Sequence, residues 1–353
     1  MELFIKGIGC ISPQLTYDNS VFLPEIKKYA GNSMKCVEPD YTPFFDGGSL
    51  RRMSRMVKFG TAAALIALKD SGVTKLDAIT TGTGYGLLEN SEKFLKNMAD
   101  ANGSVLSPTA FIQSTHNTVS STIALIAGCN AHNNTFSHKG FSFESTLTDA
   151  RLLAAEGAAN ILAGAHDEIS EKTFALMEKL HIYRQNNEAG IKEYERGGEG
   201  IVGGEGAAFF VLSSNKSEDD YAALADNIVF YNPNGIADVR LQIVDFLHHN
   251  KLELKDIDVV ISGLNGDTKA DHISKELNHE LFAEQTIVIY KHLCGEYMTA
   301  SSFGFWLATK ILLTQQVPDS VIIKNRQRQP KHILLYNAFQ NDHSLMLFRH
   351  VEV

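Results

Sequence analysis

Short apolar runs that end in glycine alternate along the chain with longer amphipathic runs, and this alternation limits the fold more than any other feature. A short apolar run fits a buried β-strand, whereas a longer run with apolar residues at helical spacing fits a helix packed on a sheet. The sequence therefore predicts an α/β protein built from βαβ units. The expected strands are 3–11, 78–86, 133–138, 160–168, 206–214, 258–266, 286–291, 332–339 and 344–351, and the expected helices are 53–72, 118–128, 143–157, 237–250, 269–281 and 301–316.

The expected elements follow a similar order in the two parts of the chain, which indicates an internal duplication. A polar and acidic stretch, "SSNKSEDDYAALAD", separates the two parts. Stretches of this length commonly connect elements within one domain, so we interpret it as a surface loop, with an interdomain linker as the alternative. The predicted organisation is one compact unit with an N-terminal half at residues 1–215 and a C-terminal half at residues 216–353.

Charge and composition argue against several classes of protein. The chain of 353 residues has 32 Lys and Arg against 41 Asp and Glu and no long block of like charge, which disfavours nucleic acid or an anionic membrane as the main partner. The start, "MELFIKGIGC", lacks the basic residues and the uninterrupted apolar run of a signal peptide. The longest apolar stretches are shorter than the ~20 residues of a membrane-spanning helix. We therefore expect a cytoplasmic protein without membrane insertion.

The sequence carries no recognisable motif for a cofactor or a metal. The glycine-rich stretches "TGTGYG" and "GGEGIVGGEG" lack Walker lysine spacing, and the second leads into an expected strand rather than a helix. The histidines form no HExxH motif, and the chain has no GxSxG elbow. The four cysteines have neither metal-ligand nor disulfide-framework spacing. We expect neither cofactor nor metal, and we interpret the cysteines as buried free thiols.

Residues 134–150, "NTFSHKGFSFESTLTDA", have the pattern of a strand-to-helix elbow. The positive end of a helix dipole lies beneath a residue at such a bend, where it lowers the pKa of a thiol and stabilises a developing anion. The bend is a suitable place for a nucleophile. The residue that we expect at this bend is Gly140, which has no side chain.

Five segments, taken in order, give the chain a strong resemblance to a known family. They are "IKGIGCISPQ", "RRMSRMVKFGTAAALIALKDSGV", "LSPTAFIQSTHNTVSSTIALIAG", "DARLLAAEGAANILAGAHDE" and "EYERGGEGIVGGEGAAFFVL". Each resembles a segment of the β-ketoacyl-acyl carrier protein synthases, the condensing enzymes of the thiolase fold. The resemblance implies two similar βαβ halves in a layered α-β-α-β-α arrangement, with a dimer formed across the N-terminal half.

The family works with a Cys nucleophile and two His residues, and the resemblance places other residues at all three positions. The Cys position falls at Gly140. The first His position falls at Leu264 when Thr268 is in register, and the second falls at Glu296 beside the retained Lys291. Leucine cannot donate a hydrogen bond to a thioester oxygen, and an ionised Glu would repel an enolate.

The C-terminal loop that resembles the family's oxyanion-supporting loop is also different. It reads "NAFQNDH", with Gln340, Asp342 and His343 where the family has glycines. We therefore expect the tight loop to be altered. Four separate parts of the catalytic apparatus are changed, whereas the segments that resemble the family scaffold are kept.

The most specific hypothesis is a catalytically degenerate ketosynthase homologue that acts as a chain-length-factor-like subunit. The resemblance implies a catalytic ketosynthase partner in a heterodimer, with a homodimer as the alternative, and an acyl carrier protein that delivers an acyl chain. Fatty-acid, polyketide or polyene synthesis is the implied setting. Phe141 and Phe143 beside the elbow are candidates for shaping or gating the product tunnel, or they fill the volume left by an absent substrate.

Two other classes of function stay open. An active acyltransferase or condensing enzyme requires a relocated nucleophile with a base, and the candidates are Ser137, Ser142, Ser145 and Cys294 with His138, His292 or His343. Helix capping by the serines and burial of Cys294 are the simpler interpretations. A scaffold or regulatory protein would bind a partner without changing the length of the product.

Overall fold

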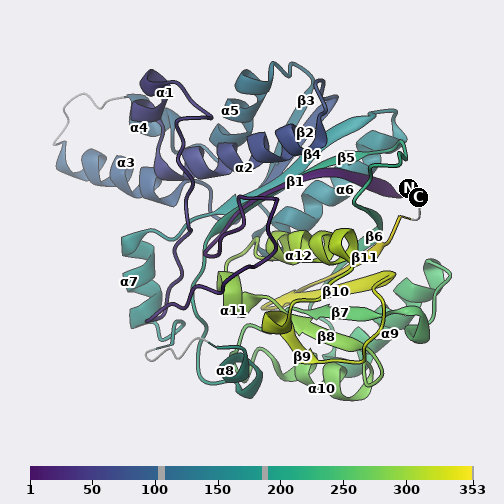
Figure 1. The fold of residues 1–353 in the computed structure, drawn as a ribbon. Coiled ribbons are helices and arrows are strands. Elements are labelled where there is room, and N and C mark those ends of the chain that lie inside the picture. Colours follow the sequence, from purple (N-terminus) through teal and green to yellow (C-terminus); the bar gives the residue numbers. More distant parts are fainter. Residues whose placement is uncertain (102–107, 185–189, 352–353) are drawn as a thin grey trace.

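A single mixed sheet of eleven strands organises the computed structural model, which describes residues 1–101, 108–184 and 190–351 (Figure 1). The strands are β1 (Leu3–Ile11), β2 (Ala78–Gly82), β3 (His132–Phe136), β4 (Asn160–Asp167), β5 (Gly206–Ser213), β6 (Ala222–Tyr231), β7 (Val259–Ser262), β8 (Thr286–Ile289), β9 (Ile322–Lys324), β10 (His332–Phe339) and β11 (Asp342–Arg349). Their order across the sheet is β3-β2-β4-β5-β1-β6-β11-β10-β7-β8-β9. The first five strands of the chain therefore lie on one side of the β1–β6 junction and the last six on the other.

The two sides of the sheet repeat one pattern of strand directions. On the first side β2 is parallel to both β3 and β4, and β5 runs antiparallel to β4 and β1. On the second side β7 is parallel to both β8 and β10, and β11 runs antiparallel to β10 and β6. A short antiparallel pairing of Leu3–Ile5 with Ala222–Leu224 joins the two sides. The division at residue 215 into two halves of one compact unit stays a prediction.

The helices form layers on the faces of the sheet (Figure 1). The larger ones are α2 (Arg55–Ser71), α3 (Leu88–Asp100), α5 (Thr118–Ala127), α6 (Ser142–Ala155), α9 (Gly235–His249), α10 (His272–Glu280) and α12 (Ser301–Thr314), and the shorter ones are α1 (Gly47–Arg52), α4 (Pro108–Ile112), α7 (Glu171–Lys179), α8 (Ile191–Arg196) and α11 (Lys291–Cys294). Helices α2 and α5 cover the outer face of the first side, and α9 and α10 cover the outer face of the second. Helices α6 and α12 lie between the two sides.

Alternate side chains of the central strands pack in different layers of the fold. On β5, Phe210 and its neighbours at every second position pack in the central core with α6 and α12, whereas Phe209 packs in the outer core with α2. On β11, Phe348 faces the central core and Leu347 faces the core with α9. Successive side chains of a strand point to opposite faces, so each strand binds two layers of helix. This confirms the layered α-β-α-β-α arrangement.

The central helix α12 is apolar on nearly all of its surface. From Ser301 to Leu312 every residue is buried. A helix that is apolar all round belongs inside a protein, because a surface helix keeps one polar face. Within the described ranges, no helix has both the length and the apolar character required to cross a bilayer.

Most predicted elements are confirmed. The first half of the stretch "SSNKSEDDYAALAD" is a loop, as predicted. The second half of that stretch instead begins β6, which the sequence analysis missed. The strand opens with Ala222 and Ala223, and alanine has a low preference for strands. The missed strand is the one that joins the two sides of the sheet.

Candidate functional site

A cavity of ≈ 820 Å³ lies where the parallel strands of both sides end. Strands β2 and β4 contribute the residues that follow their carboxyl ends, and β7 and β10 do the same from the other side. In α/β proteins ligands bind beyond the carboxyl ends of parallel strands. The position and the size of this cavity are those of a small-molecule site.

The predicted elbow lies next to this cavity. Its backbone bends most sharply at Lys139, whose φ is 49°, and a short 3₁₀ turn (Lys139–Phe141) then leads into α6. Gly140 is the buried residue that follows the bend, and its N–H donates to Asp342 Oδ2 at 3.1 Å. Neither Lys139 nor Gly140 provides a thiol or a hydroxyl at this bend.

The space beside Gly140 is filled by the β10–β11 turn. A Cβ atom on Gly140 would lie 2.9 Å from Asp342 Oδ2 and 2.9 Å from Phe339 Cβ. Contacts below 3.0 Å force a neighbour to move. A cysteine at this position therefore requires that the turn shifts.

The β10–β11 turn remains tight although its expected glycines are absent. Phe339 pairs with Asp342 across a two-residue turn, and Gln340 takes the left-handed conformation with φ 55°. This turn carries side chains where the resemblance implies glycines, and its backbone forms a short hairpin. A non-glycine residue in this conformation is strained.

A buried ion pair occupies the second His position. Glu296 Oε2 lies 2.8 Å from Lys291 Nζ, and the two side chains are 2% and 0% exposed. Main-chain hydrogen bonds of Glu296 with Val202 O (2.8 Å) and Gly204 N (2.9 Å) fix the loop that carries it. Among the described residues Glu296 Oε1 has no hydrogen-bond partner. The second His position therefore holds a buried carboxylate, which accepts hydrogen bonds, where the family resemblance implies a donor.

Two neighbouring residues at the first His position, Leu264 and Asn265, have different surroundings. Leu264 is buried in an apolar cluster with Met34, Tyr194 and Ile289 and does not line the cavity. The next residue, Asn265, does line it and donates from Nδ2 to Glu296 Oε2 at 3.0 Å.

Thr268 lines the same wall of the cavity, and its N–H donates to Gly198 O at 2.8 Å. Asp271 closes this loop by accepting the N–H groups of Asn265 (2.9 Å) and Gly266 (2.7 Å). Burial raises the pKa of the Asp271 carboxyl to about 6. The loop thus brings together Thr268, Asn265 and, through Asn265, the Lys291–Glu296 pair.

The two elbow phenylalanines lie outside this cavity. Phe143 is fully buried and packs against Phe210 and Phe305 at ring-centroid distances of 5.9 and 5.7 Å. Phe141 lies against the His138 ring at 5.4 Å. This placement favours a space-filling role for Phe143, and a gating role for either residue stays a prediction about a tunnel shared with a partner.

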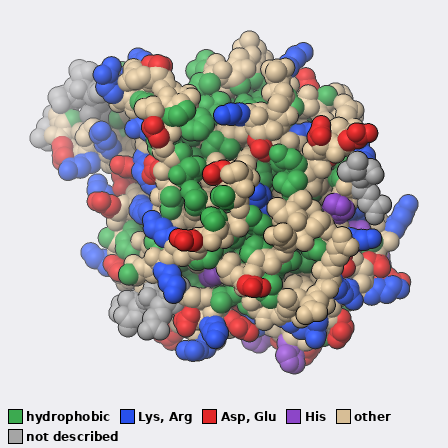
Figure 2. Space-filling view, in the orientation of Figure 1, with side chains coloured by type: hydrophobic (Ala, Val, Ile, Leu, Met, Phe, Trp, Pro, Cys, Tyr) green, Lys and Arg blue, Asp and Glu red, His purple; other side chains and the backbone are tan. Residues whose placement is uncertain are grey.

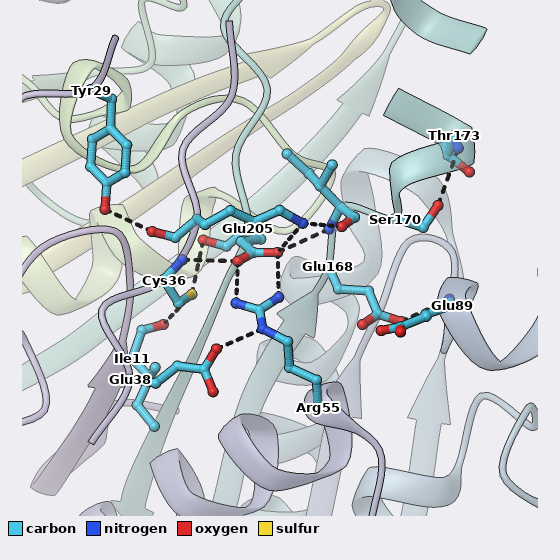
Figure 3. Close-up of polar contacts among 12 residues, drawn as sticks. Ile11, Tyr29, Cys36, Glu38, Arg55, Glu89, Glu168, Ser170, Thr173 and Glu205 are labelled. Carbon is cyan, nitrogen blue, oxygen red and sulfur yellow. Dashed lines mark hydrogen bonds and ion pairs between the residues drawn. The ribbon is translucent and has the colours of Figure 1, made fainter. Parts of the chain in front are cut away.

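A buried carboxylate fixes the wall of the cavity at the end of β4 (Figure 3). Glu205 accepts from Arg55 Nη1 at 2.9 Å and from the N–H groups of Cys36 (2.8 Å) and Ile169 (3.2 Å). Burial alone raises the pKa of Glu205, but the hydrogen bond and the charge of Arg55 outweigh it and hold that pKa below its usual value. Glu205 is therefore a charged anchor that positions Ile169, a residue of the cavity wall.

Two more carboxyl groups follow β4. Asp167 accepts from Thr299 Oγ1 at 2.8 Å and from Gly84 N at 2.8 Å, and burial raises its pKa. Glu168 accepts from Glu89 N at 3.1 Å, and burial raises its pKa to about 7 (Figure 3). Sequence reasoning missed this acidic side of the cavity, although "AGAHDE" displays both residues directly after an expected strand.

With this geometry in place, comparison with known proteins decides the family. The family model described as "Beta-ketoacyl synthase, N-terminal domain" matches residues 6–218, which is more than half of the chain. The chain belongs to the β-ketoacyl synthase family. A putative β-ketoacyl synthase 1 for oxytetracycline polyketide from Streptomyces rimosus is 30% identical over 233 residues, which cover 60% of this chain and 52% of that protein. The chain thus spans about half the length of this curated relative.

Solved structures of β-ketoacyl synthases share the fold over nearly the whole chain. The ishigamide ketosynthase/chain length factor has a TM-score of 0.79 at 16% identity, with 99% of each chain covered. The ketosynthase (ApeO) in complex with its chain length factor (ApeC) from Xenorhabdus doucetiae has a TM-score of 0.75 at 14% identity, with 99% of this chain and 98% of that chain covered. At these identities the likeness shows the fold, which is the predicted thiolase-like α/β fold of ketosynthases.

The candidate replacements for the family nucleophile differ in their surroundings. Ser142 Oγ accepts from His138 N (2.9 Å) and donates to Lys139 O (2.7 Å), which is a local turn contact. Ser145 Oγ lies 3.4 Å from His138 Nδ1, while Ser137 Oγ donates to Gly84 O at 3.3 Å. Of these serines only Ser145 has a histidine ring nitrogen within hydrogen-bond range, and it does not line the cavity.

The remaining candidates lie inside the protein. Cys294 is buried, and burial raises its pKa well above the usual value, so its thiol is not activated. His292 Nε2 and Ser320 O lie 2.8 Å apart, and His343 Nδ1 and Tyr336 OH lie 2.8 Å apart. The cysteines are all free, as expected, but Cys36 and Cys129 are only partly buried.

The charged side chains suggest no metal centre and no basic band. In the part of the chain that the structure describes, no three His, Cys, Asp or Glu side chains are grouped so that they could hold a metal ion. On the face shown in Figure 2, Lys and Arg side chains are interspersed with Asp and Glu.

Proposed function

We propose that this β-ketoacyl synthase homologue is a non-catalytic, chain-length-factor-like subunit that pairs with a Cys-bearing ketosynthase in polyketide or fatty-acid synthesis. The observation that carries the proposal is the elbow, where Gly140 stands and where Asp342 and Phe339 fill the space of a side chain. The Lys291–Glu296 pair supports it, because the buried carboxylate stands at the family's second His position, where it cannot donate to a developing negative charge.

The edge of the sheet supports a partner across the N-terminal half. Strand β3 ends the sheet, and among the described strands it pairs with β2 alone. Beside it lies α5, on which Leu125 is 83% exposed and Ile126 is 44% exposed. An unpaired edge strand next to exposed apolar side chains is a suitable dimer surface.

The names of the similar proteins fit such a pairing. One is a ketosynthase/chain length factor, and another is a ketosynthase in complex with its chain length factor. By analogy, the catalytic subunit of the pair accepts acyl groups from an acyl carrier protein. A homodimer is the alternative assembly.

Co-expression tests the assembly. The full chain, carrying an affinity tag, is produced with each Cys-bearing ketosynthase of the same genome, and native mass spectrometry measures the stoichiometry of what co-purifies. We expect a one-to-one heterodimer that Leu125→Arg abolishes. The matched control is Leu241→Arg on α9, which alters another exposed leucine (62%) on the other side of the sheet. Purification of the chain only as a homodimer would contradict the proposal.

Product analysis separates this function from that of a scaffold. The heterodimer, the ketosynthase alone and the ketosynthase with an unrelated partner are compared for the chain length of their products. A chain-length-factor-like subunit changes the distribution of lengths. A scaffold changes only the yield.

A second candidate function, acyl transfer from a relocated nucleophile, rests on the 3.4 Å contact of Ser145 with His138. The chain is incubated with acyl and malonyl carrier protein, and peptides are searched for acyl groups by mass spectrometry. A stable adduct on Ser145 that Ser145→Ala removes would refute the non-catalytic role. The ketosynthase partner, which carries the family Cys, is the positive control.

A further inference from the structure

A buried carboxyl group connects three elements around the central layer of helices. Glu144 lies in the first turn of α6, and its side chain is completely buried. Its Oε1 accepts from Ser344 Oγ of β11 at 2.9 Å. Ser301 of α12 is also completely buried and lies beside the same carboxyl group. These three side chains, the Glu144 cluster, therefore link the helix that follows the elbow to α12 and β11.

Two polar atoms of the Glu144 cluster have no hydrogen-bond partner among the described residues. They are Glu144 Oε2 and Ser301 Oγ. Buried polar atoms of folded proteins normally have a partner, so two orphaned oxygens beside each other require an explanation. A proton on Glu144 Oε2 satisfies both atoms, because the carboxyl O–H then donates and the Ser301 hydroxyl accepts.

Glu205 shows which contacts an ionised carboxylate has in this protein. Its side chain is also buried, and it receives the guanidinium of Arg55 and two main-chain N–H groups. Glu144 instead receives one hydroxyl on Oε1 and, from the described residues, nothing on Oε2. Burial of an ionised carboxylate costs much free energy unless it is paired, so the contacts of Glu144 favour the neutral acid.

The charges near the Glu144 cluster do not reverse this preference. Lys291 acts on Glu144 but is already paired with Glu296 at 2.8 Å, and Tyr290 donates to Asn337 Oδ1 at 2.9 Å. Burial raises the pKa of the Glu144 carboxyl to about 7, and the nearby donors and Lys291 do not offset this effect.

Other titratable side chains on the elements packed against α6 contact other groups or solvent. They are His132 (with Asp149), Lys139 (exposed), His166 (stacked on Phe209), Asp167 (with Thr299), Asp226 (with Arg151), Tyr231 (exposed), Lys310 (with Asn19 O), Asp342 (with Gly140 N), His343 (with Tyr336) and Arg349 (with Glu2).

We propose that Glu144 is a neutral carboxylic acid in the folded chain, with its O–H donating to Ser301, and that loss of this proton to solvent at rising pH loosens the contacts of α6 with α12 and β11. The cluster lies one helical turn after Gly140, so the position of the elbow depends on it. The inference goes beyond the proposed function, because it concerns the isolated chain and requires no partner.

Urea unfolding of the full chain between pH 5 and pH 8 tests the proposal. A pKa raised from 4.5 to about 7 stabilises the fold at low pH, and this stability is lost as the pH rises through about 7. Glu144→Gln keeps an acceptor for Ser344 and offers an N–H to Ser301, but it cannot ionise. From pH 5 to pH 8 the unfolding constant of the unmodified chain should rise roughly 70-fold relative to that of Glu144→Gln. Parallel pH profiles would overturn the proposal.

Two further variants separate the carboxyl group from other effects. Glu156→Gln is the matched control, because Glu156 is exposed at the end of the same helix, and this variant should follow the profile of the unmodified chain. Glu144→Met removes the ionisable group without adding an amide. It should be less stable at low pH, because Ser344 loses its acceptor, but it should show the same relative change with pH as Glu144→Gln. A constant ratio for Glu144→Met would also overturn the proposal.

Infrared difference spectra of the unmodified chain and Glu144→Gln at about pH 6 report the proton itself. A protonated carboxyl group has a carbonyl stretch that an ionised carboxylate lacks. The unmodified chain should show this band, and Glu144→Gln should have lost it. Absence of the band from the difference spectrum would mean that Glu144 is ionised in the folded chain, which contradicts the proposal.

Discussion

Breaking the Lys291–Glu296 pair should reveal how much this site depends on a residue that replaces a histidine of the family. The two side chains are almost fully buried and 2.8 Å apart. Removal of one partner from a buried ion pair costs about 3–5 kcal/mol, because the other charge stays buried without compensation. Typical domains have a free energy of unfolding of about 5–15 kcal/mol, so either single substitution should be strongly destabilising.

The contacts of each partner predict an order of effects. Glu296→Met leaves Lys291 with Ala338 O at 3.3 Å as its remaining acceptor, and it also deprives Asn265 Nδ2 of its acceptor. An unsatisfied buried donor adds about 1–3 kcal/mol. Lys291→Met leaves Glu296 with the hydrogen bond from Asn265. Glu296→Met should therefore cost more than Lys291→Met.

Urea unfolding followed by circular dichroism at neutral pH measures these free energies. The double variant, with Met at both positions, buries no unpaired charge and should cost far less than the sum of the two singles. Lys255→Met is the control, since Lys255 and Glu253 form a pair of similar length, 2.7 Å, that is largely exposed and worth about 0–1 kcal/mol. Additive costs in the double variant, or single costs similar to that of Lys255→Met, would refute the reasoning.

Three further predictions concern single positions. Gly140→Cys alone should give no condensation product with malonyl carrier protein, and measurable turnover would contradict the interpretation of this site. The same variant should lower the thermal unfolding temperature, because its Cβ atom would lie 2.9 Å from Asp342 Oδ2. The two ring nitrogens of His166 have no hydrogen-bond partner among the described residues, and burial lowers the pKa of this residue from 6.5 to about 3. The neutral ring therefore favours folding above pH 6.5, and this stability, roughly 5 kcal/mol, is lost as the pH falls from 6.5 toward 3. Urea unfolding across that range should show a shallower pH dependence for His166→Phe, and an unchanged slope would argue against this role. Gln340→Gly should raise the free energy of unfolding by about 1 kcal/mol, because glycine adopts a φ of 55° without strain; a loss of stability would mean that the Gln340 side chain makes a contact of greater worth.

Local patterns in the sequence were sufficient for the α/β class of this fold, whereas the layered arrangement was expected from the family resemblance. Strands such as β5 and β10 are continuous apolar runs, and α2 ends at Gly72 in the left-handed conformation that its sequence suggests. Strand β6 escaped detection because it begins with alanines, which favour no strand by themselves. Pairing with β1 and β11, which is a tertiary property, makes this segment a strand.

Sequence alone predicted only those parts of the site whose residues are close together in the chain. The elbow at Gly140 and the positions of Lys291 and Glu296 are local in sequence and were identified, but their ion pair was not predicted. The sequence also does not show that Leu264 is buried in an apolar cluster while the next residue, Asn265, lines the cavity, because this depends on how the loop turns. The contact of Asp342 with Gly140 joins residues 202 positions apart, and no spacing rule indicates it.

The Glu205 anchor was missed for the same reason. Arg55 lies 150 positions before Glu205 in the chain. Each belongs to a segment that resembles the family, but the resemblance by itself gives no partner for either charge. Burial of Glu205 beside the partly exposed Arg55 makes these two charges a structural pair.

The contact between Asp342 and Gly140 also limits how sequences of this kind can change over generations. A side chain at position 140 meets both the Asp342 carboxylate and Phe339 Cβ at 2.9 Å, so a substitution at 140 is tolerated only after the β10–β11 turn has moved away. The order of the two changes is therefore not free. Mutational paths from this chain toward a Cys-bearing homologue pass through the β10–β11 turn first, and a library that varies position 140 alone would leave those paths unsampled.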